Sequence, residues 1–195
     1  MKNDIVIAGV GGQGILTIAA IVGHAAVANG LNVKQSEVHG MAQRGGAVLA
    51  HLRISDDVIY SDLVPKGKAD VVLAVEPLEA LRHIDFLAPD GVVLANEVPV
   101  VNIDNYPDLE TVLAELRQYP RRLVLDADQV AKNTGSARAM NMVMLGALSP
   151  FLDLPDESLT DMIKQAFERK GEKVLKTNLE AFTEGQQAAE TVADA

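Results

Sequence analysis

The residue spacing with the most chemical content lies near the N-terminus, where three glycines follow the pattern Gly9-x-Gly11-x-x-Gly14. A short β-branched run, residues 4–8, comes directly before this pattern, and a long apolar stretch, residues 15–29, follows it. A glycine turn between a strand and a helix directs main-chain N–H groups and the positive end of the helix toward an anion. We therefore predict a phosphate-binding turn. The alternative is that these glycines only close a strand–helix connection.

The same turn also contains Gly12 and Gln13, and this pair is unusual for a plain dinucleotide-binding fingerprint. The Gln13 amide could form hydrogen bonds with a ligand or with a partner chain. Glu37 lies at the end of the next predicted strand, 23 residues after Gly14, where dinucleotide folds place an acid that binds a ribose hydroxyl. Glu37 favours NAD in that interpretation. A solvated or loop-capping glutamate is the alternative.

A second candidate segment, residues 38–46, has the sequence VHGMAQRGG and no helical or strand periodicity. Arg44 precedes Gly45 and Gly46, which leave room for its planar guanidinium to bind a phosphate or carboxylate. His39 could donate, accept or titrate there. A rigid loop in which Arg44 makes a structural ion pair is the alternative.

Composition excludes several kinds of chemistry. The chain has no cysteine, which rules out disulfides, thiolate-held zinc, cysteine-ligated iron–sulfur clusters and a cysteine nucleophile within it. The four histidines show no metal-ligand spacing, so we expect no metal ligand and no proton-transfer catalyst. A net charge of −10 disfavours binding to nucleic acid or to an anionic membrane. With no signal-like or membrane-spanning segment predicted, we expect a cytoplasmic protein.

The elements that would position these residues predict an α/β fold. We expect a doubly wound, mostly parallel, Rossmann-like sheet with a β-hairpin insertion and C-terminal helices, forming one domain over residues 1–195. A flexible tail is expected from about residue 185 to 195, because that segment is small and acidic. Asp126 and Asp128 are expected to cap a helix, and Asn141 to be a buried hydrogen-bonding residue. The predicted strands are 4–8, 31–37, 69–75, 91–95 and 122–125, the hairpin is 47–54 with 58–63, and the main helices are 15–29, 78–84, 109–119, 136–148, one from 155 and one over 174–182.

Three segments together resemble a known family. They are IVIAGVGGQGILT, SEVHGMAQRGGAV and ARAMNMVMLGAL, and they are similar to the γ-type component of the 2-oxoacid:ferredoxin oxidoreductases over about residues 1–185. The segment EVHGMAQRGG resembles the β subunits of the indolepyruvate:ferredoxin oxidoreductase branch, whereas the pyruvate and 2-oxoglutarate branches carry a Ser-Tyr-Gly version before Arg-Gly-Gly.

The resemblance implies a reaction in which a 2-oxoacid, here an arylpyruvate, is oxidatively decarboxylated to an acyl-CoA while electrons pass through iron–sulfur clusters to ferredoxin. Thiamine diphosphate supplies the decarboxylation chemistry. This chain has no cysteine and no Gly-Asp-Gly followed by Asn-Asn at thiamine-site spacing. Both cofactors are therefore expected on a large partner α subunit, ferredoxin is expected to react through the complex, and this chain alone is expected to be inactive.

The resemblance also associates the γ-type domain with coenzyme A docking. Two alternatives remain open, an NAD(P)-binding oxidoreductase domain and a scaffold whose glycine turn binds nothing. The residues that we expect to contact coenzyme A are Gly9, Gly11, Gly12, Gln13, Gly14, Arg44, Gly45 and Gly46, with His39 near the subunit interface or the mouth of the site.

Overall fold

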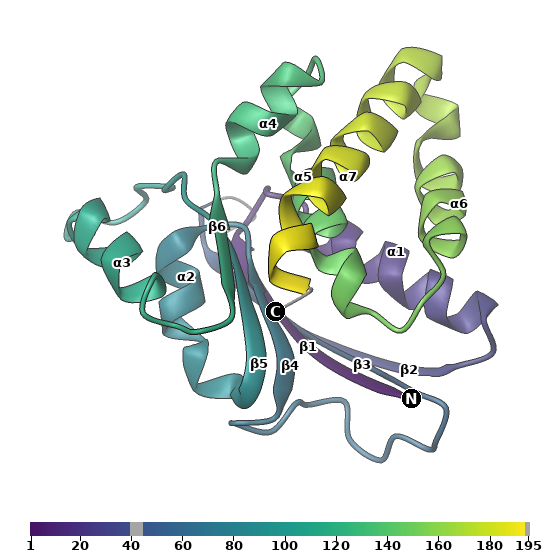
Figure 1. Ribbon diagram of the computed structural model, residues 1–195, viewed down its shortest axis with the longest axis horizontal. Coiled ribbons are helices and arrows are strands. Elements are labelled where there is room, and N and C mark those ends of the chain that lie inside the picture. The colour runs from purple at the N-terminus through teal and green to yellow at the C-terminus, as the bar shows by residue number, and fades with distance from the viewer. Residues whose placement is uncertain (40–44, 194–195) are drawn as a thin grey trace.

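The computed structural model describes residues 1–39 and 45–193, and these build one six-stranded sheet with helices on both faces (Figure 1). The strand order is β2-β3-β1-β4-β5-β6. Strands β1, β4, β5 and β6 pair in parallel, whereas β3 is antiparallel to both of its neighbours. The expected α/β, mostly parallel sheet is thus confirmed. The strands are β1 (Lys2–Val10), β2 (Asn32–His39), β3 (Ala47–Ser55), β4 (Ala69–Ala74), β5 (Leu87–Asn96) and β6 (Arg122–Leu125).

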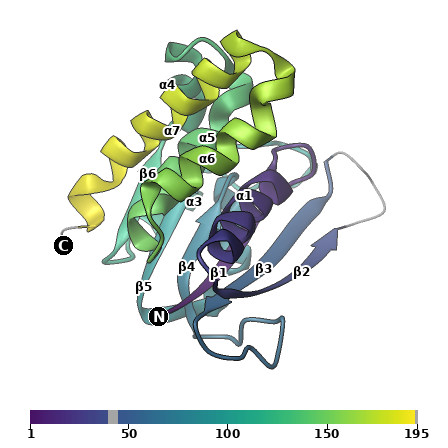
Figure 2. The same cartoon turned by 90° about the vertical axis from the view of Figure 1, so that its right-hand side faces the viewer.

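The helices divide unequally between the two faces of the sheet. Helices α2 (Pro77–Arg82) and α3 (Leu109–Leu116) cover one face, beside β4 and β5. The other face packs against the remaining helices, which stack into a second layer above it (Figures 1 and 2). These are α1 (Ile15–Ala28), α4 (Ala127–Asn133), α5 (Met140–Leu148), α6 (Asp156–Phe167) and α7 (Glu172–Ala193), with short 3-10 turns at 84–86, 137–139, 149–151 and 168–170.

The predicted hairpin is wrong. Strand β3 does not pair with residues 58–63 but lies between β2 and β1, in register Asp4↔Arg53 with β1 and Ser36↔His51 with β2. Residues 58–63 form a loop in which Val58 and Tyr60 are exposed. The loop is held by side chains instead of a strand ladder, because the Arg53 guanidinium donates to the carbonyl oxygens of residues 61 and 63 at 3.1 and 3.3 Å.

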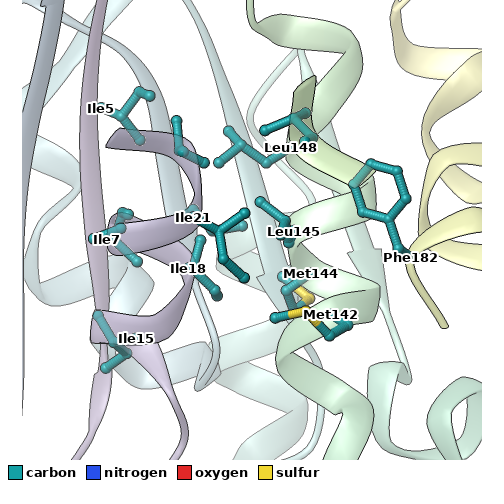
Figure 3. Packing of buried hydrophobic residues seen from close by; sticks show 14 of the residues in the cluster. Ile5, Ile7, Ile15, Ile18, Ile21, Met142, Met144, Leu145, Leu148 and Phe182 are labelled. Atoms are coloured by element: carbon teal, nitrogen blue, oxygen red, sulfur yellow. The ribbon is translucent and has the colours of Figure 1, made fainter. Parts of the chain in front are cut away.

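The main core lies between the sheet and the larger helical layer. Figure 3 shows Ile18 and Ile21 of α1 facing Leu145 and Met144 of α5, with Phe182 of α7 on the far side of α5. Helix α5 is buried along its whole length, so it forms the centre of this layer. A central helix of this kind is apolar all round instead of amphipathic, which is the pattern that ARAMNMVMLGAL shows in the sequence.

Two glycines allow α5 and α7 to pack unusually closely. A Cβ atom added at Gly146 would lie 1.9 Å from the Phe182 carbonyl oxygen, and one added at Gly185 would lie 2.0 Å from the Val143 carbonyl oxygen. Side chains at these two positions would force the helices apart. Helix α7 therefore continues to Ala193 with Ala189 fully buried, where we expected a flexible tail from about residue 185. Within that segment, Gly185 permits the close approach of α7 to α5.

Candidate functional site at the carboxyl edge of the sheet

The glycine turn after β1 meets the chain that leads into β3. The Gly11 N–H donates to the Gly46 carbonyl oxygen at 2.8 Å, and the Gly45 N–H donates to the Gly11 carbonyl oxygen at 3.5 Å. The side-chain amide of Asn102, from the β5–α3 connection, also donates to the Gly45 carbonyl oxygen. Three segments that are distant in the sequence are thereby joined where the parallel strands end, the usual position of ligand sites in open α/β sheets.

The positive end of helix α1 faces this edge without a side-chain cap. Gly14 is the N-cap residue in a left-handed conformation, with φ of 85°, and the first turn carries no acidic residue. The backbone N–H groups of Gly12, Gly14, Ile15 and Leu16 have no hydrogen-bond partner within residues 1–39 and 45–193. Unpaired donors combined with the helix dipole favour an anion. The Gly11 N–H is not free in the same way, because it donates to the Gly46 carbonyl oxygen.

Gln13 spans the ends of two neighbouring parallel strands. Its Oε1 accepts from the Val10 N–H at 2.7 Å, and its Nε2 donates to the Val75 carbonyl oxygen at 2.9 Å. Val10 ends β1, and Val75 directly follows β4. The chain leaves β1 toward α1 on one face and leaves β4 toward α2 on the other, which defines a topological switch point. The Gln13 side chain therefore lies across the crevice in which such folds place a dinucleotide.

Two glycines of the turn are required by close neighbours. A Cβ atom at Gly9 would lie 2.3 Å from a methyl carbon of Val75, and one at Gly14 would lie 2.4 Å from the Asn141 side-chain nitrogen. A Cβ atom at Gly12 would meet nothing within 4 Å, although its φ of +100° disfavours other residues. Gly9 and Gly14 thus serve packing, whereas Gly12 leaves open space above the turn.

A buried carboxylate at the end of β4 anchors the β5–α3 connection. Glu76 is 1% exposed and caps α2 by accepting from the Glu79 N–H at 2.9 Å. Its other oxygen accepts from the Val100 N–H at 3.3 Å and from the Tyr106 hydroxyl. Burial and the Glu76 carboxylate raise the pKa of Tyr106 far above its ordinary value, so the phenol remains protonated as the donor. Glu76 therefore fixes the segment whose Asn102 reaches the glycine turn.

Two further polar residues complete this edge. Asn96, at the end of β5, is fully buried, and its Nδ2 donates to Asp128 Oδ2 at 2.8 Å while its Oδ1 accepts from the Ala127 N–H at 3.1 Å. Asp126 caps α4 by accepting from the Gln129 N–H at 2.7 Å, as predicted. The expectation that Asp128 is also a cap is wrong, because its carboxylate holds Asn96 instead. These contacts link β5 rigidly to α4.

The topology does not favour the NAD interpretation of Glu37. In a dinucleotide fold the acid comes from a strand adjacent to β1, but here β3 lies between β1 and β2. Glu37 pairs with Ala50 of β3 and is exposed. Two strand spacings, about 10 Å, separate its strand from β1. Glu37 is thus too far across the sheet for the ribose contact that its sequence position suggested.

The remaining predicted residues stand as follows. Gly9, Gly11, Gly12, Gln13, Gly14, Gly45 and Gly46 lie together at the carboxyl edge. Arg44 and the side chain of His39 lie outside the described residues, so their placement stays a prediction. Sequence reasoning missed Glu76, Asn96, Asn102 and Tyr106. Glu76 and Asn96 could have been found from the sequence, because each is a polar residue that ends or follows a buried strand run.

The fold and the carboxyl edge of the sheet define a doubly wound α/β protein. Its glycine turn faces a site suited to an anion, and the Gln13 side chain lies across the crevice where such folds bind dinucleotides. Comparison with protein families matches residues 4–188 to the pyruvate ferredoxin/flavodoxin oxidoreductase family. The chain belongs to this family.

Full-length relatives narrow the class further. The chain is 41% identical to the indolepyruvate oxidoreductase subunit IorB of Pyrococcus horikoshii, over 96% of each chain. It is 38% identical to the IorB subunit of Archaeoglobus fulgidus, over 97% of this chain and 96% of the relative. Both relatives are named as subunits, and this chain is likewise a subunit of a 2-oxoacid:ferredoxin oxidoreductase.

Solved structures show the same fold. A 2-oxoglutarate:ferredoxin oxidoreductase chain from Magnetococcus marinus, solved with 2-oxoglutarate, coenzyme A and succinyl-CoA bound, superposes with a TM-score of 0.79 at 27% identity. All of this chain is covered there but only 32% of that longer chain. The pyruvate oxidoreductase subunit PORC of Thermotoga maritima gives a TM-score of 0.73 at 25% identity, over 95% of this chain and 96% of that one. No helix in residues 1–39 and 45–193 is long and apolar enough to span a membrane.

Proposed function

We propose that this chain is the small subunit of an indolepyruvate-type 2-oxoacid:ferredoxin oxidoreductase and that its glycine turn docks the phosphates of coenzyme A. The observation that carries the substrate class is the full-length identity of 36–41% with four archaeal IorB subunits. Relatives named for pyruvate, ketoisovalerate or 2-oxoglutarate are 25–33% identical. The arylpyruvate branch is therefore the best-supported assignment.

The metal-ligating residues of this chain indicate which subunit holds the cofactors. Iron–sulfur clusters are held by cysteine thiolates, and the sequence contains none. The residues that the structure describes also contain no cluster of His, Asp and Glu arranged to hold a metal. Thiamine diphosphate and the clusters are accordingly assigned to a large α subunit, which would pass electrons to ferredoxin. The cytoplasm is the proposed compartment.

Coenzyme A fits the groups at the turn. When bound, coenzyme A accepts the acyl group through its thiol, which is chemistry that this chain does not supply. The N–H groups of Gly12, Gly14, Ile15 and Leu16 can donate to phosphate oxygens, and the dipole of the 14-residue α1 favours negative charge there. The chain's net charge of −10 opposes a polyanion, so these local dipoles and Arg44 would have to position it.

The assembly is tested by expressing the chain alone and together with a large α subunit of the same enzyme class. Reduction of ferredoxin by indolepyruvate and coenzyme A is expected only from the co-purified complex. Substantial turnover by this chain alone would refute the proposed division of labour.

The docking role is tested at Leu16, an exposed residue in the first turn of α1. Leu16→Glu places a negative charge beside the free amides, while an acid in the first turn stabilises the helix. We expect the dissociation constant for coenzyme A to rise about tenfold, as for a loss of about 1.4 kcal/mol. The matched control Leu16→Gln keeps the size without the charge and is expected to change it less than threefold. Equal effects of the two variants would contradict docking at this helix end.

A further inference from the structure

The loop that follows β3, residues 56–63, gathers exposed apolar side chains at the edge of the sheet opposite the glycine turn, next to the N-terminus (Figures 1 and 2). Tyr60 is 91% exposed, Val58 67% and Leu63 50%. Nine large apolar side chains are exposed in the described part of the chain; three of them belong to this loop, and a fourth, Met1, lies beside it. Scattered apolar residues are ordinary on a protein surface, whereas a group of them indicates an interaction site.

Hydrogen bonds from the underlying sheet hold the loop in place. His51 is 4% exposed, and its Nδ1 accepts from the N–H of Val64, a buried residue at the end of the loop, at 3.2 Å. The Arg53 guanidinium donates to two carbonyl oxygens of the loop, and the Met1 amine pairs with Asp56 at 2.8 Å. A loop that is already ordered loses little conformational entropy when a partner covers it, which favours binding.

The loop also borders a concave surface. A pocket of about 520 Å³ opens between the loop and the first residues of β1, and it is lined by Val58, Ile59 and Tyr60 together with Met1. Tyrosine offers a large apolar ring with few rotatable bonds, and exposed aromatic residues of this kind often dominate the free energy of association at protein interfaces. The shape and the lining fit an apolar side chain that projects from another protein.

The charges of the loop itself are all negative. It contains three aspartates and no lysine or arginine. One of the three pairs with the N-terminal amine, whereas Asp57 and Asp62 are exposed and have no salt-bridge partner within residues 1–39 and 45–193. Lys2 and Arg53 line the pocket, but both pair with Asp4 at 2.7 Å. The surface therefore complements an apolar partner surface that carries basic residues.

The same charges disfavour a second copy of this chain as the occupant. In a two-fold contact a surface meets itself, so Asp57 and Asp62 would be brought near the same carboxylates of the other copy. The chain is a subunit of a larger enzyme, and in the Magnetococcus marinus relative the matching domain is only 32% of one longer polypeptide. Another part of the same enzyme is the occupant that both observations favour.

We propose that the loop 56–63, together with Met1, docks the large α subunit through an apolar surface with basic residues around it. This inference rests on the proposed function, which supplies the large subunit. The loop and the glycine turn lie at opposite edges of the sheet, so docking of the subunit and docking of coenzyme A can be measured separately.

The test is the affinity of the full-length chain for the immobilised α subunit, measured by biolayer interferometry. Tyr60→Ser and Val58→Ser are each expected to raise the dissociation constant at least tenfold, because each removes apolar area from the middle of the surface. Val27→Ser is the matched control, since Val27 is 59% exposed at the end of α1, away from the loop, and it is expected to change the constant less than twofold.

A second measurement tests the chemistry of the partner. The double variant Asp57→Asn with Asp62→Asn is expected to slow association at least threefold at low salt, and the difference is expected to disappear at high salt. Equal or faster association of this variant at low salt would overturn a basic partner surface.

The outcomes separate this inference from the proposed function. If the wild-type complex forms and both serine variants of the loop bind as tightly, the docking surface is wrong while the proposed function stands. If the wild-type chain forms no complex, both are wrong. A dimer of the chain alone that Tyr60→Ser dissociates in sedimentation would assign the surface to a second copy instead. Affinity for coenzyme A is expected to stay unchanged, and a parallel loss in the loop variants would overturn the assignment, because the substitutions would then act through the fold.

Discussion

The Gln13 side chain gives the sharpest test of how this edge is built. It joins the ends of β1 and β4 by accepting from Val10 N–H at 2.7 Å and donating to the Val75 carbonyl oxygen at 2.9 Å. The sequence suggested Gln13 as a ligand contact, whereas these bonds give it a structural role. Gln13→Ala separates the two possibilities, because it removes both bonds and leaves the backbone groups in place.

The size of the effect follows from the two bonds. Each intramolecular hydrogen bond contributes about 0.5–1.5 kcal/mol net, and an unmet buried donor costs about 1–3 kcal/mol. Val10 is 2% exposed, so its N–H gains little solvent, whereas the Val75 carbonyl oxygen retains a longer bond from Asn96 at 3.4 Å. We therefore expect Gln13→Ala to lower the free energy of unfolding by about 2 kcal/mol.

The assay is urea unfolding of the full chain followed by circular dichroism. With a slope of about 2 kcal/mol per molar urea, the midpoint should fall by about 1 M. Gln13→Glu keeps an acceptor for Val10 but loses the donor and sets a carboxylate against the Val75 carbonyl, so it should destabilise at least as much. Gln118→Ala is the control, because Gln118 is exposed and bonds only Glu115 on the surface of α3.

A midpoint shift for Gln13→Ala no larger than that for Gln118→Ala would show that the two Gln13 hydrogen bonds contribute no net stability. A variant with an unshifted midpoint that loses affinity for coenzyme A would instead identify Gln13 as a ligand contact.

Three further predictions concern the frame around the site. Asp4→Ala should destabilise the chain by about 2–4 kcal/mol, because Asp4 is 1% exposed and its loss leaves the Arg53 guanidinium, 2.7 Å away, without its carboxylate partner; thermal unfolding measures this. Gly146→Ala should cost about 3 kcal/mol or more, because the new Cβ would lie 1.9 Å from the Phe182 carbonyl oxygen; chemical unfolding measures this. Glu79→Gln should stabilise the chain more at pH 7 than at pH 4. Burial raises the pKa of Glu79, so the wild-type chain loses stability as the pH rises through that pKa, whereas the neutral glutamine side chain of the variant does not ionise. Urea unfolding midpoints at both pH values measure this difference.

Each of the three has an outcome that contradicts it. Gly23→Ala is the control for Gly146→Ala, since a Cβ there would meet only ordinary contacts, the nearest at 3.6 Å. Alanine stabilises a helix interior by roughly 0.5–1 kcal/mol over glycine, so stabilisation at both positions would disprove close α5–α7 packing. An equal gain from Glu79→Gln at both pH values would show that burial does not disfavour its charge. Asp4→Ala without effect would mean that the ion pair contributes nothing net.

Much of this fold could be predicted from periodicity. The buried strands around residues 69–75 and 91–95 and the strand 122–125 are confirmed, as are the helices that begin at Ile15 and Asp156. Each carries its own local signal, an apolar run or an apolar stripe bounded by glycine, proline or a cap. The predicted hairpin was wrong because the alternation of apolar and polar residues at 58–63 does not specify which strand pairs with β3. Strands β1 and β2 both form longer hydrogen-bonded ladders with β3.

The site was less predictable than the fold. The glycine turn was visible because its spacing is local, but Asn102 and Tyr106 lie in an irregular connection with no pattern to mark them. Their contacts with Gly45 and Glu76 exist only because β4 and β5 end at the same edge of the sheet.

By itself the sequence determined what this chain can offer and what it lacks: main-chain amides at a helix start, and no thiolate for an iron–sulfur cluster. These are properties of residue types and short spacings, which do not depend on distant neighbours. Only the tertiary structure decided that β3 separates Glu37 from β1, that Gln13 bridges the switch point, and that the loop 56–63 is held at the N-terminus with Tyr60 exposed. The physical reason is that strand order and helix packing are chosen by the total burial of apolar surface, and no local segment carries that information.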